Sequence, residues 1–170
     1  MPGVTGYIGI GSNLGTPLEQ VSHAIHDLRS IPEIDVLRVS SLYRSKPLVL
    51  PGEDSSNHPD YINAVMEIST ALPVEVLLTV LQGIELEYGR LRSSRRWEPR
   101  TLDLDILLYG GMTFESDRLV IPHPGIACRD FVLYPLKELC PQLIVPGHGR
   151  VEDLCRACEN RGLQRLSIKP

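Results

Sequence analysis

Two aspartates, Asp103 and Asp105, alternate with leucines in the segment Thr101 to Tyr109 (TLDLDILLY). Residues two apart on a β-strand project from the same face, so the two carboxylates would stand about 6 to 7 Å apart at the backbone. Two hard carboxylates with room for water and phosphate oxygens are a common way for proteins to hold Mg²⁺. A solvated sheet face is the alternative, because an isolated Asp-x-Asp is a weak motif.

Arginine is concentrated just before these aspartates, where the stretch Arg90 to Arg100 (RLRSSRRWEPR) has five arginines in eleven positions. One guanidinium group can donate two parallel hydrogen bonds to the oxygens of a phosphate. An arginine-rich stretch beside two metal-binding carboxylates therefore predicts a site for a polyphosphate–metal complex. A solvated basic loop is the alternative. Trp97, the only tryptophan, stands among these charges, where its flat ring could cover a heterocycle or simply pack on the surface.

Further polar residues are candidates by their spacing. Gln82 and Glu85, three apart on a predicted helix, could read a nucleotide or form an ordinary polar flank. Tyr61 and Asn63 share one face of a predicted strand, and an asparagine offers both a donor and an acceptor to a planar polar ring. His123 stands between two prolines in a stiff loop, which makes it a functional candidate.

Two other patterns predict no chemistry. The segment GIGSNLG lacks both the spacing and the ending of a phosphate-binding loop, so we interpret it as turn chemistry. Cys155 and Cys158 form a single CxxC, with Cys140 and His148 upstream, and packing cysteines explain this arrangement better than a zinc site.

Hydrophobic periodicity and turn residues predict the elements that position these groups. A long exposed loop, Pro47 to Pro59, separates two of the strands. The predicted order is strand, helix, strand, strand, helix, strand, over Thr5 to Gly11, a helix from Pro17, Ile34 to Arg44, Tyr61 to Ile68, a helix from Pro73, and Thr101 to Tyr109. This order predicts an α+β fold with the ferredoxin-like β-α-β-β-α-β arrangement, an antiparallel sheet covered by helices.

A C-terminal extension follows, in which the signals are weaker. Leu119 to Ile121 and Leu143 to Val145 are candidate short strands, and helical turns are expected near Leu136 and Leu154.

Composition limits the function classes. With 170 residues, 42% of them hydrophobic and 22% charged, we expect one domain over 1–170. The net charge of −4 provides no overall field for nucleic acid or an anionic membrane. We find no membrane-spanning stretch and no export signal, so we expect a cytoplasmic protein whose four cysteines stay reduced.

Six segments, in this order, resemble the 6-hydroxymethyl-7,8-dihydropterin pyrophosphokinase family: YIGIGSNLG, SSLYRSKPL, DYINAV, IELEYGRLR, RWEPRTLDLDILLYG and VIPHPG. The resemblance covers roughly Tyr7 to Pro146. It implies the ferredoxin-like fold, a monomer, and transfer of the pyrophosphoryl group of ATP to the pterin hydroxymethyl group, with release of AMP, in the synthesis of a folate precursor.

The resemblance also implies roles for individual residues. Asp103 and Asp105 would hold two Mg²⁺ ions, while Arg90 and Arg100 stabilise the transferring phosphates and Arg92 assists. The ATP site would be lined by Gln82, Glu85, Ile106, Arg118, His123 and Arg129. The pterin would lie near Ser45, Leu48, Tyr61, Asn63, Trp97 and Phe131, and the loops Pro47 to Pro59 and Arg90 to Arg100 would close over both substrates.

Three positions depart from the family pattern. Glu98 replaces a glycine in the arginine-rich loop, Gly125 replaces an arginine that is frequent after the His-Pro pair, and Val120 stands where a hydroxyl residue can bond the nucleotide. We expect fewer ATP contacts at the last two positions.

Two rival functions differ in what they require. A two-metal phosphodiesterase or nuclease would need further carboxylate or histidine ligands near Asp103 and Asp105, and the neighbouring sequence offers arginines instead. An RNA-binding or regulatory sheet would need a basic surface with exposed aromatic pairs, whereas the chain is acidic and only 5% aromatic.

Overall fold

The computed structural model describes residues 3–89, 102–168 and 170. Up to its fifth strand it has the predicted element order, with the second predicted strand in two pieces. The elements are β1 (Val4–Ser12), α1 (Pro17–Arg29), β2 (Ile34–Val39), β3 (Tyr43–Ser45), the short 3₁₀ helix η1 (Ser55–Asn57), β4 (Tyr61–Thr70), α2 (Val74–Glu87) and β5 (Asp103–Tyr109).

The main sheet has six strands in the order β10-β3-β4-β1-β5, with β2 also paired to β4. All these pairings are antiparallel. Counting β2 and β3 as one strand, the sheet runs from the second strand through the third and the first to the fourth, which is the ferredoxin-like topology. The predicted α+β class is confirmed, and β5 lies at one edge of the sheet.

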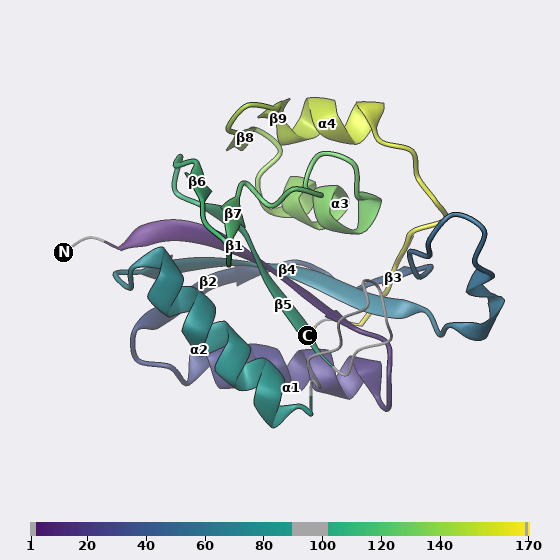
Figure 1. The fold of residues 1–170 in the computed structure, drawn as a ribbon, viewed down its shortest axis with the longest axis horizontal. Coiled ribbons are helices and arrows are strands. Elements are labelled where there is room, and N and C mark those ends of the chain that lie inside the picture. Colours follow the sequence, from purple (N-terminus) through teal and green to yellow (C-terminus); the bar gives the residue numbers. More distant parts are fainter. Residues whose placement is uncertain (1–2, 90–101, 169) are drawn as a thin grey trace.

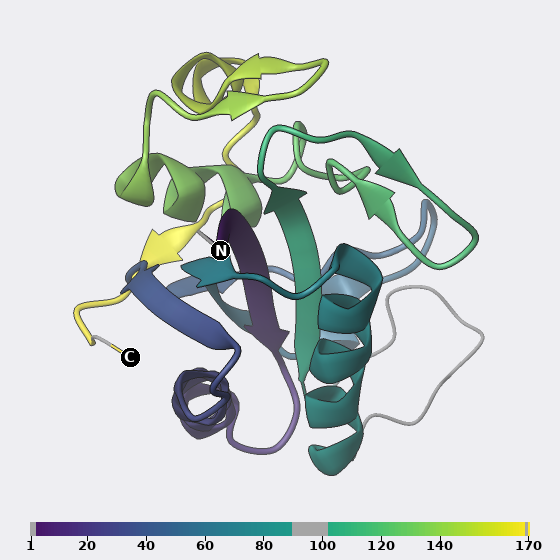
Figure 2. The ribbon, with the colours of Figure 1, turned by 90° about the vertical axis from the view of Figure 1, so that its left-hand side faces the viewer.

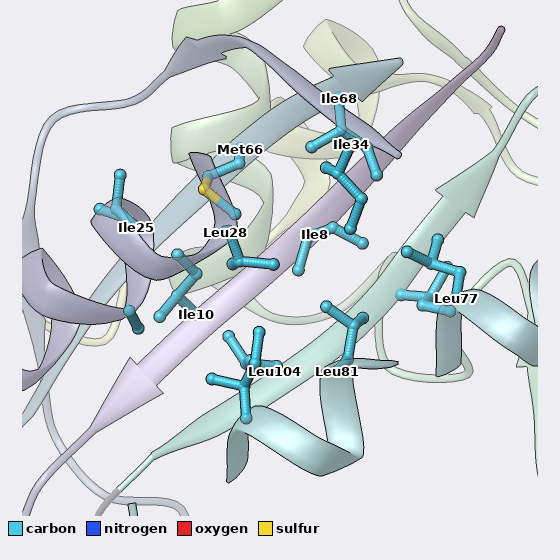
Figure 3. Packing of buried hydrophobic residues seen from close by; sticks show 14 of the residues in the cluster. Ile8, Ile10, Ile25, Leu28, Ile34, Met66, Ile68, Leu77, Leu81 and Leu104 are labelled. Atoms are coloured by element: carbon cyan, nitrogen blue, oxygen red, sulfur yellow. The ribbon is translucent and has the colours of Figure 1, made fainter. Parts of the chain in front are cut away.

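Helices α1 and α2 cover one face of the sheet (Figure 1). The leucines and isoleucines at helical spacing in these helices meet alternate residues of the strands, as the periodicity requires. Figure 3 shows this packing, in which Ile8 of β1 lies near Leu28 of α1 and Leu81 of α2, all three with no exposed surface.

The other face is covered by the C-terminal extension, which forms a second core with Tyr7, Val65 and Leu107 (Figures 1 and 2). The predicted short strands near Ile121 and Val145 and the helical turns near Leu136 and Leu154 are confirmed, and three further short strands were not predicted. The elements after Gly111 follow in chain order. They are β6 (Phe114–Glu115), β7 (Val120–Ile121), α3 (Asp130–Leu139), β8 (Ile144–Val145), β9 (Gly149–Arg150), α4 (Val151–Ala157) and β10 (Gln164–Arg165).

The single strand predicted over Ile34 to Arg44 is wrong in one respect, because the chain leaves the ladder between β2 and β3. Ser40 bonds to Val65 through both its backbone and its side chain: its N–H donates to the Val65 carbonyl, and its hydroxyl accepts from the Val65 N–H, each at 2.9 Å. The hydroxyl thus takes the place of a ladder carbonyl, which lets the backbone turn out of the sheet without leaving a buried N–H unpaired.

The predicted long loop between two of the strands is confirmed. The segment from β3 to β4 is a long loop that contains only η1. The second helix ends just before Gly89, which has a φ of +77°, a conformation in which a glycine carries no steric cost.

We expect Leu81→Ala to lower the free energy of unfolding by about 2 to 5 kcal/mol, because it leaves a cavity where a fully buried side chain met the sheet. Val76→Ala is the matched control, since Val76 lies on the same helix and is 45% exposed. The control should change stability by less than about 0.5 kcal/mol. Urea unfolding followed by circular dichroism measures both, and equal losses in the two variants would contradict this description of the core.

Candidate active site

Three neighbouring strands bring polar residues to one level of the sheet. Gly11 of β1 pairs with Asn63 of β4 on one side and with Asp103 of β5 on the other. Directly paired residues project from the same face, so the Asn63 and Asp103 side chains share a face with only a glycine between them. With adjacent strands about 4.8 Å apart, their backbones lie about 10 Å apart.

Asp103 and Asp105 lie on one face of β5, as predicted, and both are partly buried. Asp105 pairs with Gly9, the next residue of β1 on this face. Helices α3 and α4 cover the sheet farther along, at Tyr7 and Val65. Asp105 lies level with Val65, which pairs with the same Gly9, whereas Asp103 lies beyond the second core, level with Gly11 and Asn63.

Glu85 holds the backbone between the two aspartates. Its Oε1 accepts a hydrogen bond of 2.8 Å from the N–H of Leu104, and only 2% of the residue is exposed. This bond satisfies a buried backbone N–H that would otherwise be unpaired, so Glu85 fixes the position of β5 at the site. It reaches from α2 to the edge strand β5, while its predicted contact with ATP stays a prediction.

Gln82 of α2 and Arg118 are in contact at the surface of the protein, although they are far apart in the sequence. The Arg118 guanidinium donates to Gln82 Oε1 at 3.1 Å. Ile106, the remaining predicted ATP residue of β5, is 2% exposed and packs in the core. Its side chain supports the strand, and its contact with ATP is untested.

His123 is held in one protonation state by its surroundings. Its Nδ1 accepts a 3.0 Å hydrogen bond from the Gly125 N–H, so the proton of the neutral ring is on Nε2. Burial lowers the pKa of His123 and the positive charge of Arg129 adds to this effect, while the charge of Asp103 opposes both, and together they give a pKa of about 4. His123 therefore offers a neutral N–H donor near Asp103 at physiological pH.

Gly125, one of the departures from the family pattern, makes room for Arg129. A Cβ at this position would overlap the Arg129 guanidinium, which lies over the Phe131 ring at 5.9 Å from its centroid. The missing side chain thus allows Arg129 to fold back between the predicted ATP and pterin residues.

On the other side of Gly11, Asn63 is 5% exposed, and Ser45 orients its amide. Asn63 Nδ2 donates to Ser45 Oγ at 2.8 Å, which leaves Oδ1 facing Gly11, 3.4 Å from where a Cβ on that glycine would lie. The ring of Tyr61 lies 3.7 Å from the same point. An amide oxygen and an aromatic ring thus border an open floor, by which we mean the surface of the sheet at Gly11, where no side chain projects. Such a group is suited to a flat polar heterocycle.

A pocket of about 150 Å³ adjoins this group. The structure brings three of the predicted pterin residues, Ser45, Leu48 and Phe131, to its wall. The other lining residues are Lys46, Pro47, Val49, Asp130 and Arg161. Asp130 and Arg161 were missed by the sequence analysis, because no local pattern indicates that the C-terminal segment returns to β3.

Asn13 was also missed, since GSNLG was interpreted as turn chemistry. It is 2% exposed, and its Nδ2 donates to the Pro59 carbonyl at 3.2 Å. Asn13 therefore fastens the end of the long β3–β4 loop to the end of β1. A polar residue directly after a strand of alternating glycines was the available signal.

Four predicted site residues, Arg90, Arg92, Trp97 and Arg100, lie outside the described residues, as does Glu98. Their predicted roles stay predictions.

Cys155 of the CxxC pair behaves as a packing residue. Cys155 is buried, its thiol donates to the Leu133 carbonyl at 3.3 Å, and burial raises its pKa to about 11. Within the described part of the chain, no three His, Cys, Asp or Glu residues are grouped to hold a metal, and no helix is long and apolar enough to cross a membrane.

Comparison with known proteins decides the family. The sequence model of the 7,8-dihydro-6-hydroxymethylpterin-pyrophosphokinase (HPPK) family matches residues 7–141. The chain belongs to the HPPK family. It is 42% identical over 160 residues to the 2-amino-4-hydroxy-6-hydroxymethyldihydropteridine pyrophosphokinase of Pseudomonas aeruginosa, covering 94% of this chain and 95% of that one. The enzyme of the same name from Haemophilus influenzae is 41% identical over 164 residues, covering 96% and 99%.

Solved HPPK-DHPS structures share the fold. One, in complex with substrates, superposes with a TM-score of 0.77 at 10% identity, covering 99% of this chain. Another, from Plasmodium falciparum, gives 0.70 at 12% identity over 91% of this chain. This HPPK-family chain spans only 47% and 45% of those longer chains.

We expect stability to depend on His123 between pH 4 and 6.5. Because the folded pKa lies below the unfolded value of about 6.5, the unfolded chain binds the proton more strongly, and stability falls by up to about 3 kcal/mol as the pH drops through this range. His123→Asn keeps an acceptor for the Gly125 N–H but does not titrate. Urea unfolding at pH 7 and 4.5 should therefore show a smaller acid loss in the variant, and equal losses would contradict the lowered pKa.

Proposed function

We propose that the chain transfers the pyrophosphoryl group of ATP to 6-hydroxymethyl-7,8-dihydropterin, giving the pterin diphosphate ester and AMP, in tetrahydrofolate biosynthesis. Membership of the HPPK family supports this reaction. The observation that carries it is the alignment of Asn63, Gly11 and Asp103 on one face of three neighbouring strands. In this alignment Asn63, which would bind the pterin ring, lies about 10 Å from Asp103, which would bind the phosphates, and only a glycine stands between them.

The β3–β4 side would hold the pterin. The Asn63 Oδ1 can accept a hydrogen bond from a ring N–H, because Ser45 engages the amide nitrogen. Leu48 and Phe131 supply apolar pocket wall. With Tyr61 and Trp97 they complete the proposed pterin site.

The β5 side would hold the phosphates. Carboxylate oxygens suit Mg²⁺, which usually keeps few protein ligands and takes its others from water and substrate phosphates, so Asp103 and Asp105 would hold two Mg²⁺ ions together with ATP. When bound, magnesium neutralises phosphate charge. Arg90 and Arg100, assisted by Arg92, would stabilise the transferring group. Gln82, Glu85, Ile106, Arg118, His123 and Arg129 would line the rest of the ATP site.

The reaction joins the hydroxymethyl oxygen to the β-phosphorus and breaks the bond from that phosphorus to the oxygen of the α-phosphate, so that the alcohol loses its proton and AMP leaves. Positioning and charge neutralisation lower the barrier of such a transfer. His123 is suited to donate its Nε2 hydrogen to a phosphate oxygen. It is not suited to act as a base, because Nδ1 accepts from Gly125 and Nε2 carries the proton.

We propose further that residues 1–170 form one domain that acts as a cytoplasmic monomer on these small molecules, without nucleic acid or a membrane. A two-metal phosphodiesterase would need more ligands beside Asp103 and Asp105. In the ranges that the structure describes, no third histidine, cysteine or carboxylate completes such a group.

The test of this function is the identity of the nucleotide product. With ATP, Mg²⁺ and the reduced hydroxymethylpterin, the protein should release AMP, while ADP or pterin-independent hydrolysis would contradict the proposal. Asp103→Asn and Asp105→Asn should each lower kcat about a hundredfold to a thousandfold, because each removes charge that balances the phosphates. Asp35→Asn, on the exposed side of β2, is the control and should keep full activity.

Gly11→Ala tests the open floor. The added methyl group would meet Asn63 and Tyr61 at ordinary contact distances, so the protein should fold, but the methyl would stand between the two substrate sites. We expect pterin binding to weaken about tenfold, the equivalent of about 1.4 kcal/mol. Gly83→Ala on α2, where a Cβ would meet nothing within 4 Å, is the control. Equal pterin affinity in both variants, measured by calorimetry, would contradict the proposed position of the ring.

A further inference from the structure

The segment that follows α4 is bound along the edge of the sheet that carries the pocket. Strand β10 pairs with β3, and the Leu166 N–H donates to the Leu42 carbonyl at 2.8 Å. The Arg165 guanidinium donates to Ser41 Oγ at 3.0 Å and approaches Glu138 at 3.4 Å. In Figure 1 this segment descends from α4 past β3. It is therefore part of the wall beside Ser45.

Asp130 connects this segment to the pocket at a second point. The residue is 5% exposed, and each of its carboxylate oxygens accepts a backbone hydrogen bond of 2.8 Å, Oδ1 from Phe131 and Oδ2 from Arg161. Both donors belong to residues that line the pocket. Asp130 therefore sets the start of α3 and the C-terminal segment at a fixed position relative to each other.

Arg161 is the cation at this pocket whose charged group is available. Lys46, the other cation in the lining, lies 3.7 Å from Asp60. Among the residues that the structure describes, the Arg161 guanidinium makes no hydrogen bond or ion pair, although its backbone is fixed by Asp130. Pro47, Leu48, Val49 and Phe131 make much of the remaining lining apolar. A guanidinium beside such a wall is a strong donor for a ligand oxygen.

The position of the pocket indicates which end of the substrate it meets. β3 is separated from β5 by β4 and β1, so the pocket and the two aspartates lie toward opposite edges of the sheet. A pterin whose hydroxymethyl group approaches Asp103 directs its other ring, the 2-amino-4-hydroxypyrimidine end, toward β3. A guanidinium has donors and no acceptor, so it matches the 4-oxygen and not the amino group.

We propose that Arg161 binds the 4-oxygen of the pterin and that Asp130 is the residue that positions it, an inference that rests on the proposed pyrophosphokinase function. The C-terminal segment is then a determinant of substrate specificity in addition to a structural strap. Arg161 touches the substrate, whereas Asp130 acts through the backbone of Arg161.

The first experiment compares Arg161→Ala with Arg156→Ala, which removes an exposed arginine of α4 that pairs with Glu152 and Asp153. Losing a hydrogen bond to a charged donor should raise the KM for the pterin about tenfold or more, while kcat and the KM for ATP stay within twofold. The control should match the wild type. A pterin KM within twofold of the wild type in Arg161→Ala would overturn the proposal.

The second experiment uses a substrate analogue in which hydrogen replaces the 4-oxygen. Because removing the 4-oxygen also removes the neighbouring ring N–H, both proteins should bind the analogue less tightly than the pterin, but the wild type should lose about tenfold more affinity than Arg161→Ala does. Equal discrimination by both proteins would overturn the assignment, because a purely structural effect of Arg161 would not depend on the 4-oxygen.

The third experiment tests the positioning role of Asp130. Asp130→Ala should raise the pterin KM, and the double variant with Arg161→Ala should have the same pterin KM as Arg161→Ala alone, because both changes remove one contact. Additive increases would overturn the positioning role. Arg161 is exposed, so its variant decides the main proposal even if Asp130→Ala is poorly folded. Failure of the wild type to form AMP would instead overturn the function itself.

Discussion

Strand β1 sets the distance between the two halves of the site, because it pairs with β4 on one side and β5 on the other. The backbone hydrogen bonds of a sheet fix strand spacing within narrow limits, so the separation between Asn63 and Asp103 is a property of the backbone and does not depend on flexible side chains. Gly9 and Gly11 of β1 carry no side chain, so no side chain rises from this face between β4 and β5. A reaction that depends on in-line positioning of two substrates benefits from such a rigid base.

Three other carboxylates, those of Glu85, Glu138 and Asp130, support the sheet in a different way from the two aspartates of β5. Glu85 accepts from the Leu104 backbone, Glu138 accepts from the backbone and hydroxyl of Ser41 and from the Tyr43 hydroxyl, and Asp130 accepts from Phe131 and Arg161. The hydrogen bonds that Glu138 accepts lower its pKa against the opposing effect of burial. Each of these acids joins a helix, or the start of one, to a strand or segment that carries site residues, so they act by placing other groups.

The features that the sequence predicted correctly are those that depend on residues close together in the chain. Alternation placed Asp103 and Asp105 on one face, and helical periodicity identified α1 and α2, since both depend on neighbouring residues alone. The break at Ser40 was missed because it depends on a hydroxyl meeting Val65 in another strand. Asp130 and Arg161 were missed for the same reason, since their contact joins residues far apart in the chain. Tertiary partners of single polar residues leave no periodic trace in a sequence.

The pairing of β10 with β3 has a consequence for the order in which the protein is made. A ribosome releases a chain from its N-terminus onward, and elements that have emerged can fold while later ones are still being synthesised. The central strands and α1 and α2 are all available before residue 110, whereas the wall formed by residues 161–166 emerges only after every other element of the fold. The sheet that carries Asp103 and Asp105 can thus assemble during translation, and the wall of the pocket beside β3 is completed last.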